Sequence, residues 1–249
     1  MGNYLNAELY KVSKRKYPYI FLLVMLGIIL TLFIGVYSNG NPGEIDFYSM
    51  VSVLVMCLSV AIYLVIMPCD MAFSEQYKHN TLKNEVAYGI PRTRIYLGKL
   101  ITSLMAAAVL CAILILVFLG LTLLMFTKDG IGEGMSMLGG ALAMGLPTWI
   151  GSAGLFIMLS FLFKGATAAT VTYVCIIGVL PSVLNMVGML MPKLLKVTDA
   201  ISACLLNAPY DTIFAQAQPN ISYGWIVGMA WFVVTTAVGL IVFRKREIN

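Results

Sequence analysis

Six long apolar stretches constrain the fold of this 249-residue chain more than any other feature. They cover residues 20–37, 50–67, 100–126, 138–163, 165–191 and 223–243. A helix needs about 20 mostly apolar residues to cross the hydrocarbon of a bilayer. The chain is 60% hydrophobic and 11% charged, whereas a soluble domain carries about 25% charged residues. We therefore expect one all-α, polytopic integral membrane domain over residues 1–249, with six transmembrane helices.

The segment before the first apolar stretch is amphipathic. Leu5, Leu9 and Val12 recur at helical spacing, and a basic cluster follows at residues 14–16. This pattern predicts an N-terminal interfacial helix on an anionic membrane surface. A cleaved secretory signal is the alternative, but the apolar stretch that follows is long and has no small-residue cleavage site.

The basic residues are distributed unevenly between the two sides that six spans define. Thirteen of the sixteen lysines and arginines fall on the side of both termini. They are Lys11, Lys14, Arg15, Lys16, Lys78, Lys83, Arg92, Arg94, Lys99, Lys164, Arg244, Lys245 and Arg246. Because basic residues are enriched in cytoplasmic loops, both termini and the stretch 73–100 are predicted to be cytoplasmic.

Residues 73–100 form the only long polar passage between two strongly apolar ones. Its middle is predicted to be a short helix that begins near Asn80 or Thr81 and stops at Gly89 and Pro91. One face of this helix is apolar, with Leu82, Val86 and Ile90. Two alternatives explain that face: it lies in the lipid headgroup region, or it docks on a soluble partner.

The predicted spans contain no Asp, Glu, Lys, Arg or His. Proton pumps and many ion-coupled transporters need such a group at membrane depth, and so do channels with charged rings. Sodium coupling through backbone carbonyls stays open.

Pro147 and Pro181 interrupt the fourth and fifth spans and predict kinks, which either serve a gate or only shape the bundle. Gly224 and Gly228 form a GxxxG pattern that allows close helix approach.

No motif points to catalysis or to a metal site. The one histidine, His79, is expected to be an exposed polar residue, and no cysteine pair has ligand spacing. No GxxxxGK[ST] phosphate-binding loop is present. We therefore expect no catalytic, cofactor or metal site in this chain, and no nucleic-acid partner.

The connection at residues 192–222 is too apolar for a free loop, and Pro209 and Pro219 interrupt it. Two short extracellular helices against the outer mouth, partly re-entrant, explain this composition. An ordinary extracellular cap explains it as well.

The polar passage also carries a fixed order of residue types. An acid, an aromatic, a threonine in a basic and apolar helix, a glycine, an arginine and a lysine follow one another. They are Glu75, Tyr77, Thr81 with Leu82 and Lys83, Gly89 with Ile90, Arg92, and Lys99. In this order the chain resembles the permease subunits of ABC type-2 (ABC-2) ATP-binding-cassette transporters. Asn80 and Glu85 depart from the family, which usually has a glycine and an apolar residue at these positions.

The resemblance implies that the passage is a coupling helix seated in a groove of a separate ABC ATPase. Leu82, Val86 and Ile90 would fill the groove, and Lys83, Arg92 and Arg94 would lie at its rim. Glu75 would tie the end of the second span to the helix. The complete set of expected docking residues is Glu75, Tyr77, Thr81, Leu82, Lys83, Val86, Gly89, Ile90, Arg92 and Arg94.

The family also implies the setting of this subunit. We expect a multi-pass protein of the bacterial cytoplasmic membrane that dimerises with itself or a paralogue, and that works with two ATPase subunits. ATP and Mg²⁺ would bind to those partners, so this chain would not be an enzyme. Export is expected, because no feature for receiving a binding protein is apparent.

The sixteen methionines suit an adaptable apolar lining. This composition favours an amphipathic peptide or a hydrophobic antibiotic as substrate, although ordinary bundle packing explains it too. Two other functions stay open: an ATP-independent secondary transporter or channel, and a membrane scaffold or sensor subunit that transports nothing.

Overall fold

The computed structural model describes residues 2–39, 45–71, 85–163, 166–216 and 219–245. These residues are almost entirely helical, and apart from an isolated bridge between Asp46 and Thr127 they contain no β-structure. Six helical segments are long and apolar enough to cross a membrane. They are Tyr17–Ser38, Phe47–Met71, Arg92–Met125, Ile131–Leu162, Ala166–Leu190 and Ile221–Lys245. The prediction of an all-α protein with six membrane-spanning helices is confirmed.

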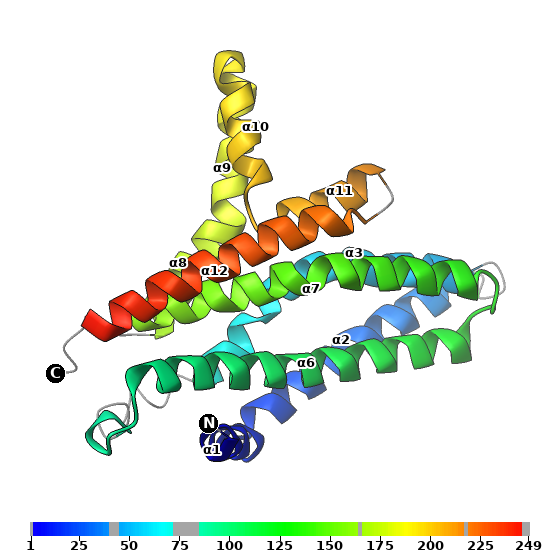
Figure 1. Cartoon of the computed structure of the whole chain (residues 1–249). Coiled ribbons are helices and arrows are strands. Elements are labelled where there is room, and N and C mark those ends of the chain that lie inside the picture. Colours follow the sequence, from blue (N-terminus) through cyan, green and yellow to red (C-terminus); the bar gives the residue numbers. More distant parts are fainter. Residues whose placement is uncertain (1, 40–44, 72–84, 164–165, 217–218, 246–249) are drawn as a thin grey trace.

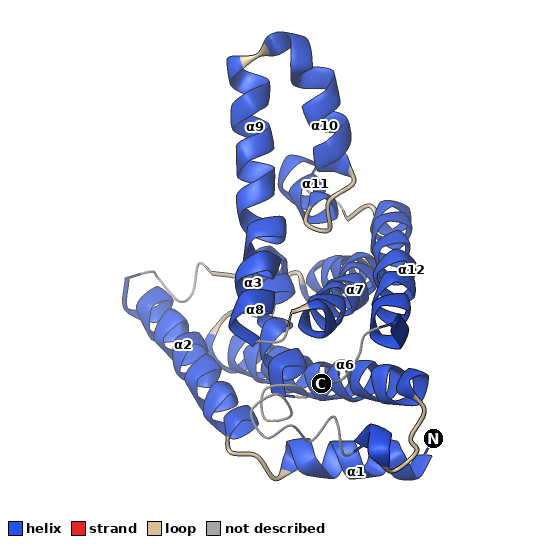
Figure 2. Cartoon of the chain, turned by 90° about the vertical axis from the view of Figure 1, so that its left-hand side faces the viewer, coloured by secondary structure: helices blue, strands red, loops and turns tan. Residues whose placement is uncertain are grey.

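Five long helices run side by side and form the bundle (Figure 1). They are α2 (Tyr17–Asn39), α3 (Phe47–Leu64), α6 (Arg92–Met125), α7 (Ile131–Leu162) and α12 (Ile221–Lys245). The N-terminal helix α1 (Gly2–Ser13) packs on α6 at the same end of the bundle as the C-terminus of α12 (Figures 1 and 2). Val12, which lies on the apolar face predicted to meet the membrane surface, is instead buried within the protein. An interfacial position for α1 stays a prediction.

The helices extend beyond the apolar stretches that predict them. The third span begins at Arg92, eight residues before the apolar run at residue 100, and α6 is 34 residues long. At about 1.5 Å per residue it measures about 51 Å, more than the roughly 30 Å of hydrocarbon. Apolar runs mark only where a helix enters hydrocarbon, whereas its backbone hydrogen bonds continue into water.

The centre of the bundle is the seam between α7 and α12. α7 is the most buried of the six candidate spans. A β-carbon at Gly224 would collide with the backbone of Met144, and one at Gly228 would collide with the backbone of Pro147. The GxxxG pattern therefore does permit close helix approach.

The two prolines have different surroundings. Pro147 is buried inside a continuous α7. Pro181 is the second residue of α9 (Leu180–Leu190), which follows α8 (Ala166–Val174) and the π-helix η1 (Cys175–Val179). Proline cannot donate a backbone hydrogen bond, and a π-turn is one way in which a helix absorbs such a defect. The irregularity of the fifth span therefore lies one turn before Pro181. A gating role for either proline stays a prediction.

Beyond the π-helix the chain leaves the bundle. α9 pairs with α10 (Leu195–Ala203) through the short 3-10 helix η2 (Pro192–Leu194), and the resulting hairpin stands away from the long helices (Figures 1 and 2). The second short helix, α11 (Ala208–Gln216), returns to pack on α3, α7 and α12. Two short helices, α10 and α11, thus precede the last span, but α10 packs on α9 away from the bundle and not against its mouth. Their extracellular placement stays a prediction.

The loop between α10 and α11 reaches deep along the bundle. Trp231, ten residues into α12, donates its indole N–H to the carbonyl of Cys204 at 2.7 Å. Tyr210 of α11 donates to the carbonyl of Gly145, in the middle of α7, at 3.3 Å. The connection is thus held against the bundle by these two bonds, and a re-entrant course stays a prediction.

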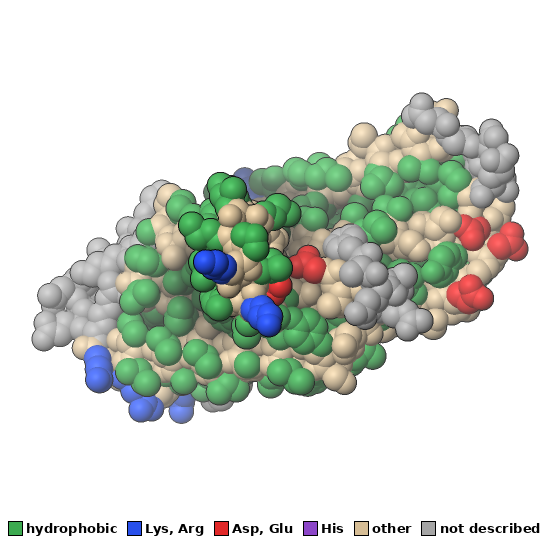
Figure 3. Space-filling model, turned by 90° about the horizontal axis from the view of Figure 1, so that it is seen from above, with side chains coloured by type: hydrophobic (Ala, Val, Ile, Leu, Met, Phe, Trp, Pro, Cys, Tyr) green, Lys and Arg blue, Asp and Glu red, His purple; other side chains and the backbone are tan. Residues whose placement is uncertain are grey.

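Much of the surface between the two ends of the bundle is hydrophobic. In Figure 3, acidic side chains gather at one end and basic side chains at the opposite end, and further acidic and basic side chains lie at and beside the projecting hairpin. Away from the hairpin, an apolar surface between charged ends fits a chain that spans a bilayer.

Candidate functional site

A helical turn directly before α6 ends in a glycine cap. The backbone N–H of Gly89 donates to the carbonyl of Val86 at 3.0 Å, and the N–H of Ile90 donates to the carbonyl of Glu85 at 3.2 Å. This pair of bonds is the Schellman motif, which needs a left-handed residue after the helix. Gly89 supplies it with φ +80°. Pro91 then begins α6 as its N-cap residue. The predicted stop at Gly89 and Pro91 is confirmed.

The apolar side chains of this turn pack on their own chain. Val86 and Ile90 are partly buried against the hydrophobic core of the bundle. Tyr88 points the other way and is 87% exposed. The turn therefore presents an aromatic side chain to its surroundings, while two of the three residues predicted to fill a partner's groove lie against the bundle.

A buried ion pair joins α1 to α6. Lys99 Nζ lies 3.3 Å from Glu8 Oε2, and the side chains of both residues are at most 3% exposed. Lys11 binds the other oxygen of Glu8 at 2.6 Å. Burial of the Glu8 carboxyl acts to raise its pKa, but the charges and hydrogen bonds of Lys99 and Lys11 outweigh burial and hold the pKa below its usual range. Glu8 is therefore a carboxylate at neutral pH.

Tyr4 connects the same helix to the turn. Its ring packs directly on Gly98, where no β-carbon would fit. Its hydroxyl donates to Glu85 Oε2 at 3.0 Å, and Lys11 Nζ lies 3.8 Å from the other oxygen of Glu85. Burial, and then the negative charges of Glu8 and Glu85, raise the pKa of Tyr4, so the hydroxyl keeps its proton and donates. Glu85, which departs from the family pattern, is thus the residue that binds the turn to α1.

Arg92 is engaged within the chain. Its Nη1 donates to the carbonyls of Phe243 at 3.1 Å and Arg244 at 2.8 Å, at the end of α12. The last carbonyls of a helix have no partner inside the helix, and a cation near them is favourable. Arg92 therefore joins the start of α6 to the end of α12. Arg94 is exposed and points away from this contact.

An aromatic cluster holds the same ends of three helices together. The rings of Tyr96 and Phe161 stack with centroids 5.0 Å apart, and those of Phe161 and Phe243 lie 4.4 Å apart. All three side chains are at most 2% exposed. Such pairs stabilise by about 1 kcal/mol each beyond the burial of their surface. The start of α6 is thus fixed to the ends of α7 and α12.

The predicted docking residues divide into two groups. Glu75, Tyr77, Thr81, Leu82 and Lys83 lie outside the described residues. Val86, Gly89, Ile90, Arg92 and Arg94 lie together at the start of α6, beside α1 and the end of α12.

Sequence reasoning missed Glu8 and Tyr88 as part of this site, and it named Lys99 only as part of the family pattern and not as a docking residue. A signal for Glu8 exists: it lies three residues after Leu5 and four before Val12, so an acid stands on the apolar face of an amphipathic helix. Such a residue requires a buried cation. No comparable signal identifies Tyr88. Among the described residues no group of three His, Cys, Asp or Glu side chains could hold a metal ion.

Comparison with protein families gives one match, which covers residues 4–182 and therefore most of the chain. The matched family is described as "ABC-2 family transporter protein". None of the curated proteins compared with this chain matches it significantly. The match includes α1, the turn and α6, which form the site described above. The chain is therefore a multi-pass membrane protein that belongs to the ABC-2 family of transporter proteins.

Proposed function

We propose that this chain is the membrane subunit of an ATP-driven exporter in the bacterial cytoplasmic membrane. It forms half of the translocation path, together with itself or a paralogue, and two separate ABC ATPase subunits bind ATP and Mg²⁺. Both termini lie in the cytoplasm. The substrate is an amphipathic peptide or a hydrophobic antibiotic, in keeping with the sixteen methionines of the chain.

One observation carries this proposal: the turn before α6 is joined to three helices. Glu85 binds α1 through Tyr4, Pro91 leads directly into α6, and Arg92 binds the end of α12. Packed and hydrogen-bonded elements of this kind carry a displacement between distant sites. A partner that pushes on the turn would therefore move α6 together with α1 and α12.

Tyr88 is the described residue best placed to contact the ATPase. Exposed tyrosines are frequent anchors of protein interfaces, because they bury a large area at a low cost in side-chain entropy. At 87% exposure, Tyr88 has almost its whole side chain available. With Leu82 from the predicted coupling helix, it would form the apolar centre of the contact, and Arg94 would lie at its rim.

The test is to purify the tagged chain from its native membrane and to ask whether an ABC ATPase accompanies it. We expect association with the native chain, and a loss of at least tenfold with Tyr88→Ala combined with Leu82→Asp. The matched control is Tyr37→Ala, because Tyr37 is a half-exposed tyrosine at the opposite end of the bundle. Thermal unfolding should be the same in all three proteins.

Three results would contradict the proposal. Association that survives the double substitution would remove the docking role of this surface. Uphill transport by vesicles that contain only this chain, driven by an ion gradient, would identify a secondary transporter instead. Association without substrate-stimulated ATP hydrolysis would indicate a scaffold or sensor subunit.

A further inference from the structure

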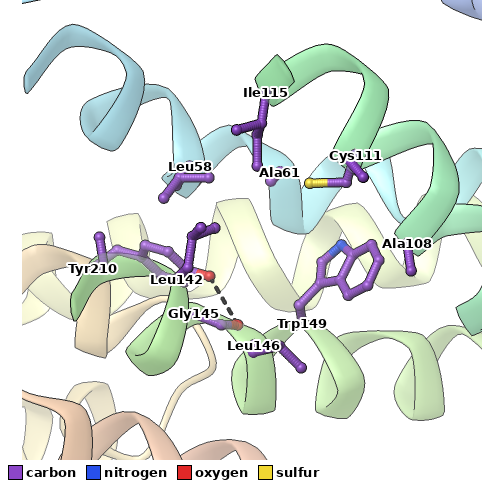
Figure 4. Close-up of a pocket in the computed structure, with 12 residues that line it drawn as sticks. Leu58, Ala61, Ala108, Cys111, Ile115, Leu142, Gly145, Leu146, Trp149 and Tyr210 are labelled. Atoms are coloured by element: carbon purple, nitrogen blue, oxygen red, sulfur yellow. Dashed lines mark hydrogen bonds between the residues drawn. The ribbon is translucent and has the colours of Figure 1, made fainter. Parts of the chain in front are cut away.

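The bundle contains an apolar cavity of about 250 Å³ between α3, α6 and α7. Twelve residues line it, and most are small or aliphatic. Figure 4 shows Leu142 and Trp149 of α7 on one side of it, facing Ala108 and Cys111 of α6 on the other. The one hydroxyl at its wall, that of Tyr210, is occupied by Thr148 at 3.0 Å and by the carbonyl of Gly145. The indole N–H of Trp149 and the thiol of Cys111 are the other polar groups of the lining residues. The rest of the lining is apolar, so the cavity suits an apolar ligand.

A second, smaller cavity of about 50 Å³ continues this space along the bundle. Both cavities are lined by Ala61, Cys111 and Trp149. The second also touches Phe21 of α2 and Pro68, near the end of the second span. Together they form a slot that runs from the middle of the spans toward the end of the bundle where α1 lies. A slot of this shape suits a linear chain better than a compact molecule.

The slot opens to an exposed apolar surface of the bundle. Ala108, Ala112 and Leu146 line it and are nevertheless exposed. The neighbouring Val109 is 60% exposed. The surface around the opening is thus apolar and lies at mid-span, where acyl chains are the surrounding solvent.

A basic cluster stands at the α1 end of the slot. Lys14 and Lys16 are exposed in the connection between α1 and α2. Lys16 precedes Phe21 by five residues, which is about 7.5 Å along a helix. Cations placed near a membrane surface attract anionic headgroups. The apolar slot therefore suits the acyl chain of an amphiphile, and the basic cluster suits its anionic headgroup.

We propose that the slot holds an acyl chain of an anionic phospholipid from the leaflet on the side of α1, with its phosphate at Lys14 and Lys16. If the termini are cytoplasmic, as proposed above, this is the inner leaflet. The bound chain would fill the space between α6 and the α3–α7 layer. The acyl chain would thus pack against the part of α6 that α3 and α7 do not contact directly.

The test uses Trp149 as a reporter, because it lines both cavities. The variant Trp225→Phe/Trp231→Phe leaves it as the only tryptophan. This protein is placed in phosphatidylcholine vesicles with one-tenth phosphatidylglycerol, whose acyl chains carry bromine, a contact quencher of indole fluorescence. We expect quenching of Trp149, and a fall in quenching by at least half when Ala112→Phe or Ala108→Phe fills the slot.

Val109→Phe is the matched control, since it adds the same side chain to the lipid-facing side of the same helix and should leave the quenching unchanged. Lys14→Ser/Lys16→Ser should remove the preference for brominated phosphatidylglycerol over brominated phosphatidylcholine. Equal quenching in the slot and control variants would overturn the acyl-chain site. An unchanged lipid preference in the lysine variant would overturn the headgroup site. Neither experiment requires the ATPase, so their outcomes are independent of the proposed export function.

Discussion

At the scale of single residues, the pair Glu8 and Lys99 contributes most to the arrangement of the candidate site. A lysine with no exposed surface is costly unless a carboxylate compensates its charge. Glu8 does so across the contact between α1 and α6, at 3.3 Å. The pair thus specifies where α1 sits, which the apolar stripe of the helix alone would leave free to rotate or slide.

Removing one partner should cost much more than removing both. Glu8→Leu leaves the Lys99 charge buried without its nearest carboxylate, and we expect a loss of about 3–5 kcal/mol in the free energy of unfolding. Glu8→Leu/Lys99→Met replaces the pair by apolar side chains and should recover most of that loss. Unfolding of the purified protein in detergent, followed by circular dichroism, measures both changes. A double variant that is less stable than the single one would contradict this account.

At the scale of secondary-structure elements, the close contact of α7 and α12 depends on glycines of α12, which have no side chain. Without a hydrophobic driving force between helices in lipid, their association relies on close packing. Gly228 is the tightest point of the seam, because its neighbours there are backbone atoms of Pro147 and Thr148, which cannot move independently.

Gly228→Ala should therefore destabilise the protein by about 1–3 kcal/mol, the usual cost of overpacking. Gly120→Ala is the control, because nothing lies within 4 Å of a β-carbon at that position in α6. Alanine is the better helix former by up to about 1 kcal/mol, so this variant should be neutral or slightly stabilised. The midpoints of thermal unfolding in detergent compare the two. Equal destabilisation by both substitutions would mean that close packing at Gly228 does not determine the stability of the protein.

At the scale of the whole molecule, the distribution of charges predicts the orientation in the membrane. Basic residues predominate at the end of the bundle with α1, the start of α6 and the end of α12, and the exposed Asp129 and Glu133 lie near the opposite end. Because basic loops are retained in the cytoplasm, we expect the candidate site to lie on the cytoplasmic side. A site on the other side would be inaccessible to a cytoplasmic ATPase.

Cysteine labelling in cells tests this orientation. In a variant without its five cysteines, a membrane-impermeant maleimide should label Asp129→Cys in intact cells. Ser13→Cys, at the end of α1, should react only after the membrane is permeabilised. Both positions are exposed, so accessibility does not differ between them in the protein itself. The reverse labelling pattern would contradict the predicted topology and the proposed docking of an ATPase.

The class of this protein, the number of its spans and the turn before α6 could all be predicted from the order of residues along the chain. Apolar runs of sufficient length have few alternatives to crossing a bilayer. The stop at Gly89 and Pro91 is a local property of two residues with special backbone geometry, and the family pattern in this passage rests on local order as well. All of these features follow from neighbours along the chain.

The contacts between distant side chains, in contrast, become visible only in the folded protein. Glu8 and Lys99 are 91 residues apart, and Arg92 lies 151 residues from the carbonyl of Phe243 that it binds. From the sequence, Arg92 lies in a basic stretch that is predicted to be cytoplasmic. That position is equally consistent with a contact at the rim of an ATPase groove and with a contact to the end of α12. The slot between α3, α6 and α7 likewise cannot be predicted from the sequence. It depends on how side chains from three helices, which lie far apart along the chain, pack against one another.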